Sequence, residues 1–271
     1  MSSSRISTVA VIGSKGEMGS LFMEVCREAG LDAAGLDKSM TDDDLADFIP
    51  GRDLVLLCVP MSVFPQVLRQ VVPHLDGKQI LADVCSVKAN PVRRMLAAYK
   101  GPVVGTHPLF GGNLPAPEDR RVAVCPGNEY GRDMSPAQME SAKKSLDAVI
   151  RFMQHIGFIP FETTTREHDI ALGYIQGLNF VTTVSYLSAT AKQPNIDRFI
   201  TPSFRRRLEA ARKMLNNDAQ MFEAMFETNP YSLDCVRQFR SHLNIAAGGD
   251  IDLLVQRAGW WWRDAIDGGG S

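Results

Sequence analysis

The chain has 271 residues, of which 45% are hydrophobic and 22% are charged, and its 29 Lys and Arg side chains nearly balance its 31 Asp and Glu side chains. This apolar fraction can bury a core, and the length predicts either one large fold or two domains. The formal net charge of -2 excludes a general nucleic-acid binder, which needs a basic face against phosphate groups.

Residues 8–162 alternate short β-branched apolar runs with longer amphipathic stretches, which is the pattern of a parallel sheet with helical crossovers. The apolar runs are nearly continuous, as expected for strands that helices cover on both faces. We predict strands at residues 8–13, 33–37, 53–60, 79–84, 103–107, 121–126 and 157–162.

No membrane span or export signal is expected. The longest apolar run, residues 54–64, is about half of the roughly 20 residues that a membrane-spanning helix needs, and Pro60 interrupts it. The first residues, MSSSRIS, lack the apolar core of a signal peptide. The five cysteines are odd in number and form no CxxC pair, which favours reduced, buried thiols over disulfides or a zinc site. We therefore predict a soluble, cytoplasmic protein with no metal and no membrane partner.

Beyond residue 163 the character of the sequence changes. Residues 166–263 show no convincing strand, but they contain long stretches rich in Ala, Leu, Met, Arg and Glu, which favour helices. Residues 168–191 are apolar or small on most sides, which predicts a helix buried against other helices or across a subunit interface. We expect a nucleotide-binding domain at residues 1–164 and an all-α domain at residues 165–271.

A glycine turn follows the first predicted strand directly and precedes an amphipathic stretch. Its pattern, GxxGxxG, lets the backbone approach a pyrophosphate at the N-terminus of a helix. Asp37 ends the second predicted strand, where a carboxylate can bind both ribose hydroxyls and repel a 2′-phosphate, although Lys38 opposes that preference. The alternative is a structural turn beside an incidental surface aspartate. We predict a Rossmann-like domain that prefers NAD to NADP. The expected cofactor contacts are Gly13, Ser14, Lys15, Gly16, Glu17, Met18, Gly19, Asp37, Val59 and Pro60.

Among the histidines, His107 is the strongest candidate for a catalytic role. It ends a predicted strand, and Pro108 keeps it extended at the carboxyl edge of the sheet, where open α/β folds bind ligands. A neutral imidazole there can take a proton from a hydroxyl as hydride leaves the same carbon. The alternative is a structural histidine at the end of a strand. His74, His155 and His242 lie in amphipathic helical surroundings, and we assign them no role.

Five motifs, taken in order, resemble those of the prephenate dehydrogenases. They are VIGSKGEMGSLF at residues 11–22, DVCSVK at 83–88, GTHPLFG at 105–111, EHDIALGYIQGLNF at 167–180 and NDAQMF at 217–222. The resemblance covers residues 8–262 and is closest to the dehydrogenase part of the bifunctional chorismate mutase/prephenate dehydrogenases. It implies NAD(P)-dependent oxidative decarboxylation of prephenate, or of its amino counterpart arogenate, in tyrosine biosynthesis. It also implies a homodimer built through the helical domain.

The resemblance further implies roles for single residues. Ser86 would hydrogen-bond His107 or the substrate hydroxyl, and Lys88 would support the site electrostatically, with a solvated lysine at a helix start as the alternative. His168 matches a substrate-binding histidine of the family, and the alternative is a histidine among charges at a helix start. Gln176 is expected to line the cleft, because it lies about 80° around an α-helix from His168.

Prephenate carries two carboxylates, so cations are expected in the helical domain. Residues seven apart return to one helix face, which pairs Arg205 with Arg212 and Arg206 with Lys213. The relatives use arginine at the positions of Arg205 and Lys213. Because lysine cannot supply a bidentate fork, either Lys213 acts as a point charge or Arg212 replaces it. Phe180 is a second departure, since the family pattern leads us to expect a histidine there.

Two other functions remain open. One is a reductase of the same two-domain architecture that acts on a hydroxy acid or an imine, and the other is a non-catalytic, NAD-binding regulatory protein. The residues at the expected catalytic positions argue against the second, whereas Lys213 and Phe180 are compatible with it. Residues 260–262 are three consecutive tryptophans, which cannot share one helix face, and we expect part of this cluster to pack against a partner subunit.

Overall fold

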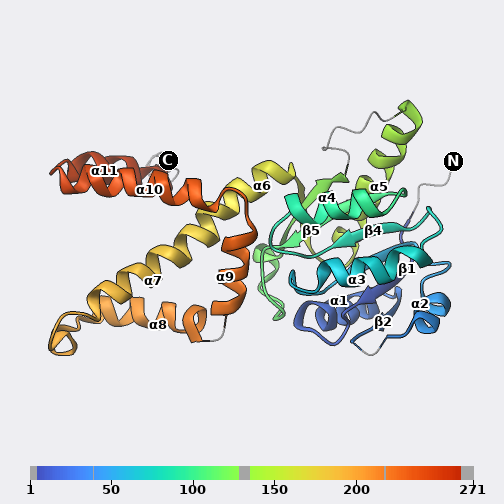
Figure 1. The fold of residues 1–271 in the computed structure, drawn as a ribbon, viewed down its shortest axis with the longest axis horizontal. Helices are drawn as coiled ribbons and strands as arrows, with labels where there is room; N and C mark the ends of the chain where they lie inside the picture. Colours follow the sequence, from blue (N-terminus) through green and yellow to red (C-terminus); the bar gives the residue numbers. More distant parts are fainter. Residues whose placement is uncertain (1–4, 39, 128–134, 217, 264–271) are drawn as a thin grey trace, which may run out of the picture.

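The computed structural model describes residues 5–38, 40–127, 135–216 and 218–263. A seven-stranded sheet with helices on both faces forms one part, and a group of helices projects from one side of it (Figure 1). The strands are β1 (Thr8–Ile12), β2 (Asp32–Leu36), β3 (Leu54–Leu57), β4 (Ile80–Asp83), β5 (Val103–Pro108), β6 (Arg121–Pro126) and β7 (Ile159–Glu162). All seven overlap the ranges predicted from the sequence.

The strand order is β2-β1-β3-β4-β5-β6-β7. The first five strands in this order are parallel, so their carboxyl ends meet at one edge of the sheet. The prediction of an entirely parallel sheet is wrong at β6, which pairs antiparallel with β5. Residues 109–120, which join these two strands, contain the short 3-10 turn η2 (Pro117–Asp119) instead of the crossover helix that a parallel connection requires.

Helices α1 and α5 cover one face of the sheet, and α2, α3 and α4 cover the other. Apolar spacing explains this arrangement, as α3 shows: Phe64, Val67, Leu68 and Val71 recur at helical intervals and are buried together. Each face therefore has its own apolar core. The helices of this part are α1 (Glu17–Glu28), α2 (Asp42–Phe48), α3 (Phe64–Val71), α4 (Ala89–Ala98) and α5 (Pro136–His155), with the 3-10 turn η1 (Val72–His74) after α3.

The helical part begins directly after β7. Thr164 accepts a hydrogen bond from the backbone N–H of Glu167, whose side chain bonds back to the Thr164 N–H, and this capping box starts α6. The helices are α6 (Thr165–Leu172), α7 (Asn179–Thr190), α8 (Pro202–Asn216), α9 (Ala219–Thr228), α10 (Ser232–Ala247) and α11 (Ile251–Ala258). The shorter turns are the π-helical η4 (Gly173–Leu178) and the 3-10 turns η5 (Ile196–Phe199) and η6 (Gly259–Trp262). The predicted helical character is confirmed, whereas the domain division at residues 164 and 165 stays a prediction.

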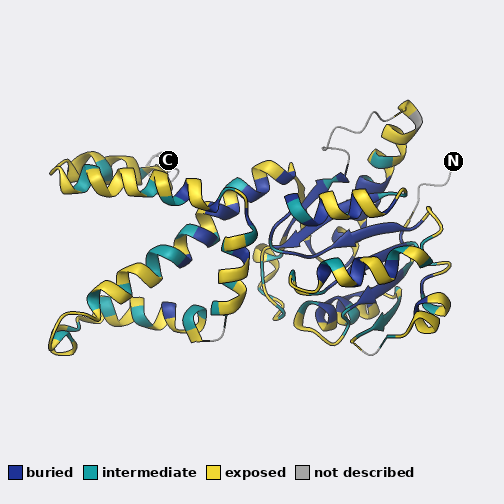
Figure 2. Cartoon of the chain, in the orientation of Figure 1, coloured by how far each residue is buried: buried dark blue, intermediate teal, exposed yellow. Residues whose placement is uncertain are grey.

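The two parts differ in burial (Figure 2). Most strand residues are buried, whereas exposed positions dominate α7, α8, α10 and α11. All five cysteines are buried and free, as predicted. Within the described ranges, no helix combines the length and the apolar character that a membrane crossing demands.

Candidate functional site

The glycine turn between β1 and α1 is closely packed. Gly13 has a φ of 87°, and a Cβ atom at this position would lie 2.4 Å from the carbonyl oxygen of Cys58. A Cβ atom on Gly19 would lie 2.1 Å from the carbonyl oxygen of Gly13. Among the described residues, no side chain caps α1 after Gly16. Its first N–H groups therefore remain available to an anion, as a pyrophosphate site requires.

Asp37 follows β2 and faces this turn. Its two carboxylate oxygens accept hydrogen bonds of 2.8 Å from the backbone N–H groups of Lys38 and Lys15. These two bonds, led by that of Lys38, lower the pKa of the exposed Asp37 carboxyl. Val59 borders the turn from the end of β3, since its Cγ1 atom lies 2.9 Å from the Cβ position at Gly13. The predicted nucleotide residues therefore gather around one turn.

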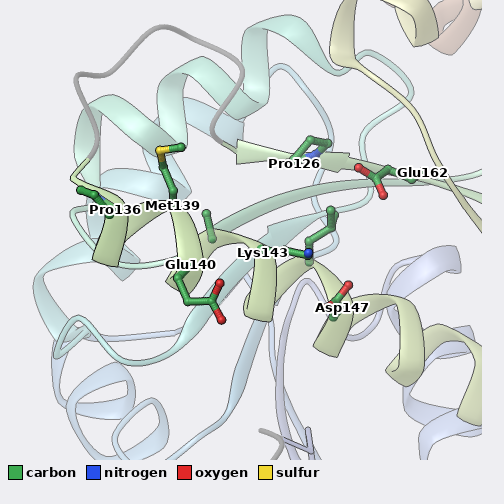
Figure 3. A pocket seen from close by; sticks show the side chains of 9 residues that line it. Pro126, Pro136, Met139, Glu140, Lys143, Asp147 and Glu162 are labelled. Atoms are coloured by element: carbon green, nitrogen blue, oxygen red, sulfur yellow. The ribbon is translucent and has the colours of Figure 1, made fainter.

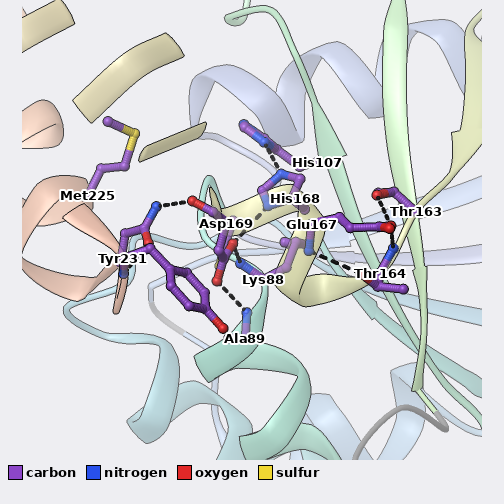
Figure 4. A network of polar contacts seen from close by, with 12 residues as sticks. Lys88, Ala89, His107, Thr163, Thr164, Glu167, His168, Asp169, Met225 and Tyr231 are labelled. Carbon is purple, nitrogen blue, oxygen red and sulfur yellow. Dashed lines mark hydrogen bonds and ion pairs between the residues drawn. The ribbon is translucent and has the colours of Figure 1, made fainter. Parts of the chain in front are cut away.

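His107 belongs to a row of three buried side chains (Figure 4). Its Nδ1 atom lies 2.9 Å from Nε2 of His168, and Nδ1 of His168 lies 2.8 Å from Oδ1 of Asp169. The residues are 4%, 3% and 0% exposed, respectively. His107 comes from the carboxyl end of β5, whereas the other two come from α6. The row therefore joins the sheet edge to the helical part.

Asp169 also binds the start of α4. Its carboxylate accepts hydrogen bonds from the backbone N–H groups of Lys88 at 2.7 Å and Ala89 at 2.8 Å. Asn229, after α9, donates to the backbone carbonyl of Asp169 at 2.7 Å. Neither Asp169 nor Asn229 was predicted from the sequence. Asp169 stands beside His168 in the EHD motif, which is a usable signal, but the contact of Asn229 spans 60 residues and leaves none.

Lys88 is completely buried, which excludes the alternative of a solvated lysine. Its Nζ atom donates to Oδ2 of Asp83, at the end of β4, and to the carbonyl oxygen of Thr106. Gly105, which precedes Thr106, packs closely against α4, because a Cβ atom there would lie 2.5 Å from Cγ2 of Val92. Lys88 thus binds the backbone of Thr106, the residue that precedes His107. Its buried positive charge also acts on His107.

Burial dominates the electrostatics of the two histidines. It holds the pKa of His107 well below 6.5, and the nearby charges of His168 and Lys88 act in the same direction. Burial also lowers the pKa of His168, although the hydrogen bond to Asp169 opposes this effect. Both imidazoles are therefore neutral near pH 7, and a neutral imidazole can act as a base.

The structure bears on the roles expected for Ser86 and His168. Ser86 is partly buried, and within the described chain it makes no hydrogen bond to His107, whose Nδ1 atom binds His168 instead. A hydrogen bond from Ser86 to the substrate hydroxyl, the other alternative, stays a prediction. His168 was expected to bind substrate, but both of its ring nitrogens already bind protein groups. The structure shows His168 as the hydrogen-bond partner of His107, and its role in substrate binding stays a prediction.

Gln176 lies in the π-helical turn η4, so the 80° angle expected for an α-helix does not apply to it. Its Oε1 atom is buried and has no hydrogen-bond partner among the described residues. Such an orphaned acceptor is available to a ligand that can donate. Phe180, where a histidine was expected, is buried and stacks on Phe222 with ring centroids 5.5 Å apart. It serves the packing of the helices.

The expected cationic cluster does not join this site within the chain. Arg205 and Arg212 line a hollow of about 350 Å³ between α7 and α8, and Lys213 is exposed on α8. No hydrogen bond or ion pair in the described ranges links these three residues to His107 or His168.

A larger hollow of about 520 Å³ lies between α5 and the ends of β6 and β7 (Figure 3). Met139, Glu140, Lys143 and Glu162 are among its lining residues. None of the predicted site residues lines it, so we exclude it from the site.

Residues 26–157 match the family model described as "Prephenate dehydrogenase, nucleotide-binding domain". The chain is 27% identical to the T-protein of Haemophilus influenzae over 224 residues, which cover 81% of this chain and 55% of that protein. It is 28% identical to the T-protein of Enterobacter agglomerans over 253 residues, which cover 92% of this chain and 62% of that protein. The chain therefore spans little more than half the length of these curated relatives.

Solved structures show the same fold. Prephenate dehydrogenase from Aquifex aeolicus, crystallised with hydroxyphenyl propionate and NAD+, matches with a TM-score of 0.75 at 18% identity, covering 98% of this chain and 99% of that chain. Arogenate dehydrogenase from Synechocystis matches with a TM-score of 0.67 at 18% identity, covering 96% of this chain and 99% of that chain. The arrangement of a sheet part followed by a helical part is thus shared with both enzymes.

Proposed function

Because residues 26–157 match the family model of the prephenate dehydrogenase nucleotide-binding domain, we propose that the chain is an NAD-dependent prephenate dehydrogenase of tyrosine biosynthesis. The observation that carries the proposal is the position of His107. This neutral, buried histidine stands at the sheet edge at which the glycine turn and Asp37 also lie. A proton acceptor and a dinucleotide site at one edge are what oxidation of an alcohol requires.

The residues of the turn fit NAD. The uncapped start of α1 suits the pyrophosphate, and no side chain at Gly13 or Gly19 obstructs it. The ionised Asp37 suits the ribose hydroxyls and opposes a 2′-phosphate, so we propose NAD rather than NADP. When bound, the cofactor supplies the hydride acceptor.

His107 can serve both proton transfers of the reaction. Its Nε2 atom makes no hydrogen bond among the described residues, so it can accept the proton of the substrate 4-hydroxyl as hydride leaves that carbon. The ring carboxylate then departs as CO2, and its bonding electrons make the ring aromatic and place negative charge on the former hydroxyl oxygen. His107 can return its proton to that oxygen, so the products are CO2, NADH and 4-hydroxyphenylpyruvate, with no net proton released.

Gln176 and the cations of α8 are the proposed substrate contacts of the helical part. The orphaned Oε1 atom of Gln176 can accept a hydrogen bond from the substrate. This acceptor also suits the ammonium group of arogenate, which makes arogenate dehydrogenation the second candidate function. Arg205, Arg212 and Lys213 remain candidates for the carboxylates, and since no hydrogen bond or ion pair among the described residues joins them to His107, we propose that they act across a dimer.

We also propose a homodimer that works in the cytoplasm. The exposed apolar side chains of the helical part, including the tryptophans of η6, support the dimer. The five free thiols support a reducing compartment.

The test is an assay of the purified protein with NAD+ and either prephenate or arogenate, following the absorbance of NADH. We expect turnover with prephenate and a lower kcat/KM with arogenate, and the reverse order would assign the second function. Binding of NAD+ without turnover of either substrate would contradict both and support the non-catalytic alternative. Turnover of hydroxy acids or imines alone would identify the rival reductase.

A further inference from the structure

Asp169 is an acceptor in every polar contact of its carboxylate. Its Oδ2 atom accepts from the N–H of Ala89, and its Oδ1 atom accepts from the N–H of Lys88 and lies 2.8 Å from Nδ1 of His168. Backbone N–H groups can only donate, so both oxygens of the Asp169 carboxylate serve as acceptors toward them. With both oxygens used as acceptors, the hydrogen of the contact with His168 belongs to Nδ1 of His168.

This assignment determines the next contact in the row. A neutral imidazole carries one N–H group and one bare nitrogen, so His168 presents a bare Nε2 to Nδ1 of His107, 2.9 Å away. A hydrogen bond there requires a hydrogen on Nδ1 of His107. We propose that Asp169 is a positioning residue that fixes the tautomers of both histidines and leaves Nε2 of His107 bare.

The opposite tautomer would disable the site. With its hydrogen on Nε2, His168 would donate to Nδ1 of His107, and the hydrogen of His107 would then lie on Nε2. His107 would present a donor to the substrate hydroxyl and could not accept its proton. The consequence for the reaction rests on the proposed oxidation, whereas the tautomers are a property of the protein alone.

The same carboxylate couples this chemistry to the docking of the two parts. Asp169 belongs to α6, but two of its hydrogen-bond donors belong to the start of α4 in the sheet part. Asn229 holds the backbone of Asp169 from the far side. The tautomer of His107 therefore depends on the contact between α6 and α4, and the base is configured only where the helical part is docked.

The first experiment uses the full chain without substrate. Long-range nitrogen–proton correlation spectra of the ¹⁵N-labelled protein distinguish protonated from bare ring nitrogens, and spectra of His107→Asn and His168→Asn assign the two residues among the five histidines. We expect both His107 and His168 to carry hydrogen on Nδ1. A hydrogen on Nε2 of neutral His107 would overturn the proposal.

The second experiment uses the variant Asp169→Asn. An asparagine amide accepts hydrogen bonds only through its oxygen, so it cannot replace both acceptor oxygens of Asp169. We expect a shift of His107 toward the tautomer with hydrogen on Nε2, and a kcat lower by about 10²-fold or more, because general base catalysis is lost. The same tautomer error accounts for a loss of about 10⁴ in the Asp→Asn variant of the serine protease triad. KM for substrate and Kd for NAD+ should stay within about twofold of wild type.

The matched control is Asp53→Asn. Asp53 also accepts backbone hydrogen bonds, from the N–H groups of Ser7 and Thr8, but it touches neither histidine. We expect its tautomers and kcat to equal those of wild type. Unchanged tautomers in Asp169→Asn would overturn the role of Asp169, and if that variant fails to fold, the spectrum of the wild-type chain still decides the tautomers. A chain with the expected tautomers that turns over neither substrate would contradict the proposed function and leave this inference standing.

Discussion

In the sheet part, Phe22, Phe64 and Leu56 are completely buried, whereas in the helical part Phe199, Val255 and Trp261 are 77%, 67% and 66% exposed. The first part encloses its apolar side chains between a sheet and two helical layers. The second part presents them on the surface of helices that project from the sheet part (Figure 1). A monomer rarely exposes apolar surface on this scale, which supports the homodimer that we propose through the helical part.

The site follows the same division. The nucleotide turn and His107 are in place within the sheet part, and α6 supplies His168 and Asp169 through contacts within the chain. The cations of α8, by contrast, make no hydrogen bond or ion pair with His107 within the described residues. The proposed base is thus held by contacts inside the chain, whereas the groups expected for the substrate carboxylates lie on the part through which we propose that the chain dimerises. The following predictions test this division, starting from the largest expected effect.

The largest effect is expected in the sheet part, from His107→Asn. Removal of the base should lower kcat by roughly 10²–10⁴-fold, because general acid–base catalysis contributes about this much. Binding of NAD+ should stay nearly unchanged, since the glycine turn and Asp37 are not altered. NADH production measures the rate, and calorimetric titration measures NAD+ binding. A rate within twofold of wild type would remove His107 from the mechanism.

The next effect concerns ion pairs in the two parts. Lys88→Met leaves Asp83 charged, buried and unpaired, and should lower the free energy of unfolding by about 3–5 kcal/mol. The exposed pair of Arg237 and Asp234 in α10 is the comparison, and Arg237→Ala should cost about 1 kcal/mol or less. Urea denaturation measures both. The double variant Lys88→Met/Asp83→Leu should lose less than Lys88→Met alone, since no unpaired charge remains, and an equal loss would contradict this account.

The third effect tests the exposed face of the helical part. If Trp261 packs against a second copy, Trp261→Glu should raise the dissociation constant of the dimer by about 30-fold or more, the size of an interface hot spot. Ile159→Glu, at an exposed apolar position on β7, is the control and should leave dimerisation unchanged. Sedimentation equilibrium measures both. A monomeric wild type, or equal effects of the two variants, would refute the assignment of this face.

Local patterns made much of the sheet part predictable. The seven apolar runs have the length of buried strands. The glycine turn and Asp37 each follow a strand directly and His107 lies at the end of one, so their place at the carboxyl edge follows from the sheet alone. The direction of β6 was not predictable in the same way, because it depends on a connection without a helix.

Contacts distant in sequence limited the prediction of the site. The carboxylate of Asp169 meets backbone groups 80 and 81 residues away, and no local pattern indicates such a pairing. The π-helical turn changed the position expected for Gln176, since α-helical spacing was assumed there. Lys88 resembles a surface residue at a helix start, and its burial becomes evident only once β4 and β5 enclose it.

The last prediction is a pH dependence that both parts share through His107 and His168. Both pKa values are lowered in the folded protein, so below about pH 6.5 the unfolded chain binds protons that the folded chain does not. Stability should therefore fall as the pH falls from 6.5, by up to about 1.4 kcal/mol per pH unit for each histidine, until the folded-state pKa is reached. Urea denaturation between pH 7 and 5 measures this slope, and His107→Asn should remove one histidine's share of it. The lowered pKa also keeps His107 neutral, so kcat/KM should hold its plateau to a lower pH than an ordinary imidazole allows. If the free energy of unfolding of His107→Asn depended on pH with the same slope as that of wild type, protonation of His107 would not contribute to this dependence.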